Sequence, residues 1–287
     1  MADRQLIDFR IKPPQRDSDD DPRVEPAPGM RRYDELYGLE ELLQTPFEAL
    51  VAEMEKFNVR GIMQAEYEAS GQSRWWNDRV AELVGRRPDL FIGGIATVEP
   101  GRPDAIEELD RAHEELGLRG VVFQPGFLRI YPTDPSCREI FSYCQKRGVP
   151  VTLHTGVNFT LDGSIDFGRP IWVDQVACEF PDLVLVCNHG GWPWVGESIA
   201  VAWKHPNVYL EFGAIAPKYM AHPKGGWQPM PHWMRTQLRD QILLGTDWPL
   251  LHYDRLIEEL PLLELDQRAE RAYLGGNAER VIEGVWG

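Results

Sequence analysis

Residues 134–156 read DPSCREIFSYCQKRGVPVTLHTG and contain one predicted helix followed by one predicted strand. Asp134 and Pro135 are residue types preferred at the cap and first position of a helix, and Gly148 is typical of a helix end. The run that follows is apolar up to His154 and lacks strict alternation, which predicts a strand buried on both faces. The stretch therefore predicts one unit of a parallel α/β fold.

Seven further apolar runs of this kind lie along the chain. They are LIDF near residue 6, VRGIMQ near 59, FIGGIATV near 91, RGVVFQP near 119, LVLVCNHGG near 183, VYLEFGA near 208 and QILLGTDWP near 241. Amphipathic helical segments lie between them; one begins at Thr45-Pro46, with Thr45 as its expected N-cap, and another ends before Gly117. Eight alternations of strand and helix predict one α/β domain over residues 1–287, a (β/α)8 TIM barrel.

An open, doubly wound sheet is the alternative arrangement of such units. A sheet of that type that bound a dinucleotide would normally have a glycine-rich turn after its first strand, and none follows here. A segment rich in proline and acidic residues, at about 13–44, follows instead. We interpret it as an irregular loop over one mouth of the barrel, either simply solvated or acting as a lid over a substrate.

The composition excludes several classes of partner. The 287 residues include 30 basic and 45 acidic side chains, a net charge of −15, which disfavours binding to nucleic acid or to anionic membranes. No apolar run approaches the roughly 20 residues of a membrane span, and the N-terminus lacks the apolar centre of a secretory signal. The four cysteines show no CxxC spacing. We therefore expect a cytoplasmic protein with reduced thiols, and a homodimer stays open.

Polar side chains stand where several predicted strands end, and the active sites of (β/α)8 barrels lie at the carboxyl ends of their strands. His154 ends the fifth strand, His189 follows the sixth and Asp247 follows the eighth. Each is beside a glycine or a turn, so we expect all three to converge above the barrel. The other histidines are His113 and His205, in or beside helices, and His222, His232 and His252, in loops.

Further polar and aromatic residues are expected in the walls of this site. The polar candidates are Gln64, Glu66, Gln124 and Glu211, which suit hydrogen bonding to a substrate. The aromatic candidates are Trp192, Trp194, Trp227, Trp233 and Trp248. Such a wall fits a flat, partly apolar substrate, although tryptophans that pack loops together or join subunits would give the same pattern.

The strand-end motifs resemble those of a known family. The chain carries IDFRIKPP at the first strand, HTG at the fifth, HGG at the sixth, GTDWP at the eighth and GGNAER in the last helix. This order is similar to that of the amidohydrolase-related proteins, which include aminocarboxymuconate-semialdehyde and resorcylate decarboxylases and pyrone-dicarboxylate lactonases. The resemblance implies a distorted barrel with one zinc or manganese ion. By position it assigns His154 and Asp247 as metal ligands and His189 as an acid or base.

The chain departs from that pattern at the first strand. Where the family has two histidine ligands, this sequence has Arg10 and Lys12, whose protonated side chains are not ligands for a divalent cation. Alternation along a strand puts both on one face. We therefore expect no metal at an intact site, with zinc open as an alternative on His154, Asp247 and His189, and we expect the two cations to anchor an anionic substrate.

These residues favour an enzyme that hydrolyses an ester, lactone or amide bond of a small, aromatic or unsaturated carboxylate. In this interpretation Asp247 is the general base, and His189 and His154 orient or protonate the reacting oxygen. The residues expected to bind the substrate are Arg10, Lys12, Gln124, Trp192 and Trp248. Two alternatives stay open: a decarboxylase of an aromatic or unsaturated acid, and a barrel that binds a small molecule without turning it over.

Overall fold

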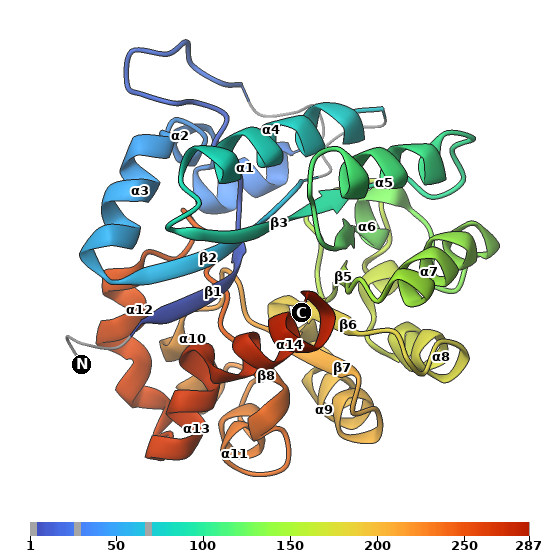
Figure 1. Ribbon diagram of the computed structural model, residues 1–287. Coiled ribbons are helices and arrows are strands. Elements are labelled where there is room, and N and C mark those ends of the chain that lie inside the picture. The colour runs from blue at the N-terminus through green and yellow to red at the C-terminus, as the bar shows by residue number, and fades with distance from the viewer. Residues whose placement is uncertain (1–4, 26–29, 67–70, 287) are drawn as a thin grey trace.

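The computed structural model describes residues 5–25, 30–66 and 71–286, which form a barrel of eight parallel strands (Figure 1). The strands are β1 (Leu6–Ile11), β2 (Val59–Gln64), β3 (Phe91–Thr97), β4 (Val121–Phe123), β5 (Val151–His154), β6 (Leu185–Asn188), β7 (Val208–Glu211) and β8 (Ile242–Leu243). Each strand pairs in parallel with the next one in the sequence, from β1 to β8. The predicted barrel and its eight strands are confirmed.

The barrel is closed between β8 and β1 by a seam rather than by a regular ladder of strand pairs. The backbone N–H of Phe9 donates to the carbonyl of Leu244 at 2.8 Å, and the N–H of Asp247 donates to the carbonyl of Arg10 at 2.9 Å. These two bonds hold the end of β1 against the segment that follows β8. As a result, Arg10 and Asp247 lie side by side.

Most of the helices surround the barrel on its outside, and the C-terminal helix lies across one end of it (Figure 1). They are α1 (Arg31–Tyr37), α2 (Leu39–Leu42), α3 (Phe47–Lys56), α4 (Ser73–Arg86), α5 (Ala105–Glu114), α6 (Pro125–Leu128), α7 (Pro135–Arg147), α8 (Ile171–Glu179), α9 (Val195–Lys204), α10 (Pro217–Ala221), α11 (Pro229–Arg235), α12 (Tyr253–Glu259), α13 (Gln267–Arg271) and α14 (Asn277–Trp286). Short 3-10 or π turns occupy Ile165–Gly168, His189–Gly191, Arg239–Gln241, Leu260–Leu263 and Ala272–Gly276. None of the helices in the described ranges is both long and apolar enough to cross a bilayer.

The ends of two helices test the predicted caps. Asp134 caps α7 as expected, because its side chain accepts from the backbone N–H of Ser136, and Gly148 ends that helix in the left-handed region at φ 65°. The predicted cap at Thr45 is wrong. Pro46, with extended backbone, holds the cap position of α3, and the N–H of Phe47 donates to the carbonyl of Arg16 instead of to a side chain.

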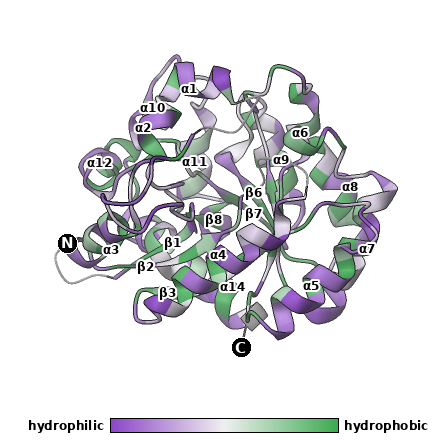
Figure 2. Cartoon of the chain, turned by 90° about the horizontal axis from the view of Figure 1, so that it is seen from above, coloured by the Kyte–Doolittle hydropathy of each residue, from purple (hydrophilic) through white to green (hydrophobic). Residues whose placement is uncertain are grey.

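Two layers of apolar side chains stabilise the barrel. Inside it lie Phe9, Ile62, Ile95, Val122, Val186 and Leu243, with Ile7, Ala278 and Val281 in the same cluster. A larger cluster lies between the strands and the surrounding helices. Figure 2 shows that the peripheral helices carry hydrophilic as well as hydrophobic residues, as amphipathic helices do. Each fully buried large apolar side chain contributes about 1.5–3 kcal/mol, so this packing dominates the stability of the scaffold.

The segment at about 13–44 is more ordered than an irregular loop, which corrects the prediction. It contains α1 and α2, while residues 26–29 lie outside the described part of the chain. The buried Arg16 holds the segment together, because its guanidinium donates to three backbone carbonyls, those of Gln44, Asp19 and Asp21, at 2.6–2.8 Å. The proline and acidic residues at the start of the segment indicated a loop, whereas both helices lie in its second half, after Met30.

Candidate active site

A cavity of about 680 Å³ lies at the carboxyl ends of the strands. Its lining includes Arg10 and Lys12 at the end of β1, His154 at the end of β5, His189 after β6 and Asp247 after β8. These residues come from four separate parts of the chain, and the closed barrel brings them to one place. The convergence that the sequence predicted is therefore present in the structure.

Arg10 is the centre of the polar network beneath this cavity. Its side chain is 2% exposed, and its Nε donates to Asp247 Oδ1 at 3.0 Å. Nη1 donates to Gln64 Oε1 at 3.2 Å, and Nη2 donates to Glu66 Oε1 at 3.3 Å. Since most of its N–H groups contact protein acceptors, Arg10 chiefly holds two carboxylates in place, and its guanidinium has little left to offer a substrate.

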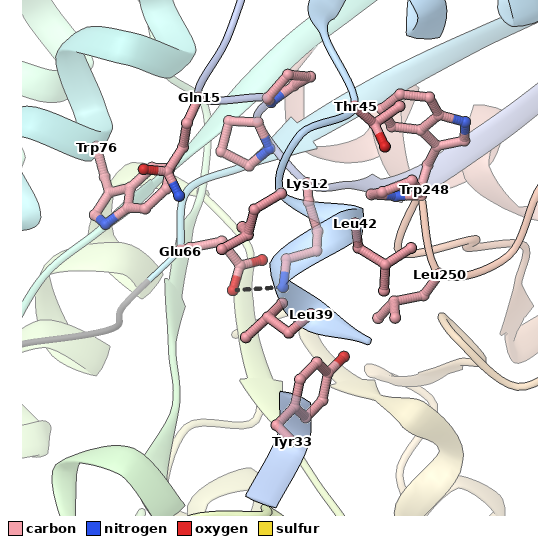
Figure 3. Close-up of a pocket in the computed structure, with 14 residues that line it drawn as sticks. Lys12, Gln15, Tyr33, Leu39, Leu42, Thr45, Glu66, Trp76, Trp248 and Leu250 are labelled. Carbon is pink, nitrogen blue, oxygen red and sulfur yellow. Dashed lines mark ion pairs between the residues drawn. The ribbon is translucent and has the colours of Figure 1, made fainter. Parts of the chain in front are cut away.

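Lys12 is the second cation at the end of β1 and lies nearer the open space. Its side chain is 19% exposed, and Nζ lies 3.8 Å from Glu66 Oε2 (Figure 3). Gln124 Nε2 donates to the same carboxylate oxygen at 3.0 Å. Glu66 therefore links Arg10 in β1, and Lys12 just after it, to Gln124, and Gln124 lines the main cavity as predicted.

The charges around Arg10 set the protonation of two buried carboxyl groups. Burial alone would raise the pKa of Asp247, but Arg10 and Lys12 bring it below its usual value of 3.8, so this group is ionised at neutral pH. Burial raises the pKa of Glu211 to about 8, with Arg10 opposing the shift. Glu211 therefore carries a proton at neutral pH, in contrast to the ionised Asp247.

His189 is held as a neutral imidazole. Its Nδ1 lies 2.8 Å from the carbonyl oxygen of Gly213, an acceptor only, so Nδ1 carries the proton and Nε2 has the lone pair. Burial and the charge of Arg10 lower its pKa to about 4. At neutral pH, His189 is therefore a proton acceptor and not a proton donor.

His154 lies next to His189, with ring centroids 4.6 Å apart. Its side chain is buried, and Nδ1 has no hydrogen-bond partner among the described residues. Burial, together with the neighbouring His189 and Arg10, lowers the pKa of His154 well below 6.5. Both histidines are therefore neutral under ordinary conditions.

The two tryptophans predicted to bind the substrate occupy different places. Trp192 lines the main cavity and is 42% exposed, with its Nε1 donating to the carbonyl of Gly225 at 3.1 Å. Trp248 lies outside that cavity, which corrects the prediction. It is buried, it lines a side pocket of about 30 Å³ beside Lys12 (Figure 3), and its Nε1 donates to Glu53 Oε2 at 2.8 Å.

The sequence left several lining residues unassigned. Tyr33 and Tyr37 of α1 and Phe159 form an aromatic cluster at the cavity, with centroids 4.9–5.8 Å apart. Two cations, Lys224 and Arg255, line it as well. The spacing of Tyr33 and Tyr37, one helical turn apart, was the one available signal. Of the remaining tryptophans and histidines, Trp227 and His222 line the cavity, whereas Trp194, Trp233 and His232, which lies in α11, do not.

The residues at this site do not fit the metal that the resemblance implies. Asp247, one of the two inherited ligands, is already paired with the guanidinium of Arg10 at 3.0 Å, and Lys12 lines the same cavity. A divalent ion at His154 and Asp247 would face two positive side chains where two neutral donors are needed. Within the described ranges, the one group of three potential donor atoms lying within 4.8 Å of each other is found elsewhere, on the outside of the barrel.

Comparisons with known proteins agree with this architecture. The 2-amino-3-carboxymuconate-6-semialdehyde decarboxylase of Dictyostelium discoideum is 24% identical over 72% of this chain, but the match spans only 65% of that protein. An uncharacterised TIM-barrel protein from Bordetella bronchiseptica has a TM-score of 0.79, with 26% identity over 99% of this chain and 100% of that one.

A dihydroxybenzoic acid decarboxylase from Polaromonas sp. JS666, solved with bound manganese, has a TM-score of 0.69 at 15% identity and covers 99% of this chain and 97% of that one. Other solved structures with this fold are a 2,6-dihydroxybenzoate decarboxylase and a probable 2-pyrone-4,6-dicarboxylic acid hydrolase. The family model for amidohydrolases matches residues 47–283, most of the barrel. The chain that folds into this barrel, with its strand-end histidines and aspartate in one cavity, belongs to the amidohydrolase family.

Proposed function

We propose that this chain hydrolyses an ester or lactone bond in a small, unsaturated or aromatic carboxylate. The observation that carries the proposal is the protonation of the site: His189 is neutral, with its lone pair on Nε2, and Asp247 is ionised. Attack by water on a carbonyl requires a group that accepts a proton. Both groups meet that requirement at neutral pH, and the cavity also offers cations for the carboxylate of the substrate.

In the proposed reaction, His189 Nε2 accepts a proton from water while the water oxygen bonds to the carbonyl carbon. The negative charge of Asp247 stabilises the imidazolium that forms. When the carbon–oxygen bond breaks, His189 returns the proton to the leaving oxygen. The base is thus His189 in preference to Asp247, because the pKa of His189 is about 4 whereas that of Asp247 lies below 3.8, and Asp247 Oδ1 already accepts from Arg10.

We further propose that Arg10 and Lys12 replace part of the electrostatic role that a metal ion has in relatives. Arg10 fixes Asp247 and Glu66, and Lys12 supplies positive charge at the cavity for an anionic group. A charge-assisted contact of this kind contributes about 1.5–3 kcal/mol to binding. This assignment rests on Arg10 and Lys12, which are cations at the two positions where the family has histidine ligands.

Decarboxylation is the second candidate. The names of several relatives and structural neighbours favour it, and Glu211 retains a proton that such a reaction needs at carbon. Glu211, however, is fully buried and does not line the cavity, whereas His189 and Asp247 line it and are proton acceptors. Hydrolysis therefore fits the groups that face the cavity better.

The deciding experiment offers the purified chain a panel of pyrone carboxylates, aryl esters and dihydroxybenzoates, and measures acid release and carbon dioxide release separately. We expect acid release without carbon dioxide. His189→Asn should lower the rate by about a hundredfold or more, the usual range for a lost general base. His232→Asn, an exposed histidine in α11 that does not line the cavity, is the matched control and should leave the rate unchanged.

Each other outcome points to one alternative. Carbon dioxide release without acid release would assign the chain to the decarboxylases. If carboxylates bind in calorimetry but no member of the panel is turned over, the binding-only barrel is the better interpretation. Equal rates in His189→Asn and in the control would remove His189 from the mechanism.

A further inference from the structure

We propose that Asp174, Cys178 and His205 form a binding site for a single zinc-like ion on the outside of the barrel. Asp174 and Cys178 lie one turn apart on α8, and His205 directly follows α9. One donor atom of each residue lies within 4.8 Å of the other two. The two helices are neighbours (Figure 1), and the site is remote from the cavity described above, so it is independent of the proposed function.

The donor atoms have a spacing close to that of a tetrahedral site. His205 Nε2 lies 2.8 Å from Asp174 Oδ1 and 4.0 Å from Cys178 Sγ. Ligands of tetrahedral zinc, with bonds of about 2.0–2.3 Å, lie roughly 3.3–3.8 Å apart, so small side-chain rotations would suffice. An imidazole, a thiolate and a carboxylate form a donor set typical of zinc.

The three residues differ in their exposure to solvent, and this difference suits the binding of an ion. The side chain of His205 is 11% exposed, so packing holds its ring with Nε2 turned towards the other donors. Cys178 is the exposed member and opens the group to solvent. An ion can therefore reach a partly preformed site, with its remaining position open to water.

A cation already lies among these donors. Nζ of Lys204 lies 2.6 Å from Asp174 Oδ1 and 3.6 Å from Cys178 Sγ. The side chain of Lys204 is 55% exposed, so it can turn into water when a stronger cation arrives. On binding, Zn²⁺ takes the place of the ammonium group and Cys178 loses its thiol proton to solvent, which leaves the ion neutralised by one thiolate and one carboxylate.

The place of the site in the fold suggests what the ion would do. Helix α8 follows β5, which ends at His154, and α9 follows β6, which precedes His189. An ion held by both helices would join the two units that carry the histidines of the cavity. Because it binds only the folded chain, zinc at a hundredfold excess over its Kd should raise the folding equilibrium constant about a hundredfold.

The test uses cobalt(II) on the full chain, because a cobalt–thiolate bond gives an intense near-ultraviolet absorption. We expect this band in the wild type and its loss in Cys178→Ser. The other three cysteines are buried, and burial raises the pKa of Cys137 and of Cys187 to about 12, so they do not compete. Asp247→Asn should leave the band in place.

Lys204→Ala provides the sharper readout. Lys204 must give up its contact with Asp174 before an ion binds, so removing it should strengthen cobalt and zinc binding by up to about fivefold. Lys146→Ala, an exposed lysine at the end of α7, is the matched control and should change nothing. The proposal is overturned if no absorption depends on Cys178 under excess cobalt, or if Lys204→Ala binds no more tightly than the control.

Discussion

Replacing Arg10 by Met should destabilise the fold severely, although methionine fills much of the same space. The substitution removes the partner of Asp247 at 3.0 Å and of Glu66 at 3.3 Å, both of which are buried. Removing one member of a buried ion pair costs about 3–5 kcal/mol, because the remaining charge is left without compensation. We expect a loss of this size in the free energy of unfolding.

The loss should depend on pH in a defined direction. Without Arg10, the strongest of the charges that lower the pKa of Asp247 is gone, so we expect burial to raise this pKa above its unfolded value and the folded variant to take up a proton more readily than the unfolded chain does. The difference from the wild type is therefore greatest at about pH 8 and shrinks towards about pH 5. Urea unfolding at both pH values, in buffers free of added metal, measures it.

The control is Arg102→Met, which removes the same type of side chain from an exposed pair with Asp104. Surface pairs contribute about 0–1 kcal/mol, so this variant should unfold nearly as the wild type does. If Arg10→Met costs no more than Arg102→Met, or if its cost grows as the pH falls, the network around Arg10 does not hold buried charge in the way described.

Three further outcomes follow from the same site. Lys12→Met should weaken the binding of a carboxylate substrate roughly tenfold to over a hundredfold in calorimetry; an unchanged affinity would reject Lys12 as the anchor. The kcat/KM of hydrolysis should be level above about pH 5.5 and fall as His189 is protonated through its pKa of about 4, and an inflection near the ordinary value of 6.5 would contradict its burial beside Arg10. Arg10→His with Lys12→His, in a Cys178→Ser background that removes the outer site, should acquire zinc binding and gain about 2.7 kcal/mol at a hundredfold excess over Kd. Failure of that folded variant to bind zinc would mean that residues 10 and 12 do not occupy the ligand positions.

The sequence was sufficient for the strand-end residues because the barrel itself places them. A parallel strand that ends in a polar residue can only present it at one rim, so His154, His189 and Asp247 could be brought together without knowing any contact between them. Arg10 and Lys12 were placed there by the alternation of side chains, and both line the cavity although the strand ends at Ile11. The tautomer of His189 could not be foreseen, since it depends on the carbonyl of Gly213, which comes from the next strand unit.

Trp248 is a residue near a strand end that does not face the cavity. Asp247 has a positive φ of 53°, so the regular alternation of side chains ends there and the next residue need not face the cavity. The partner of the Trp248 indole, Glu53, lies 195 positions earlier in the sequence, in α3. The helices α1 and α2 were missed for another reason: each is short, Gly38 with a φ of 66° separates them, and they follow a stretch rich in proline and acidic residues.

The seam between β1 and β8 couples the chemistry of the cavity to the integrity of the barrel. The backbone bond from Asp247 to Arg10 and the ion pair between their side chains cross the same joint. A ligand that competes for the side chain of Arg10 or of Asp247 therefore weakens or strengthens the contact that closes the barrel. The rate of hydrogen–deuterium exchange at the amides of Phe9 and Asp247, compared with the rate at amides in the strands from β2 to β7, therefore reports whether a ligand occupies the cavity.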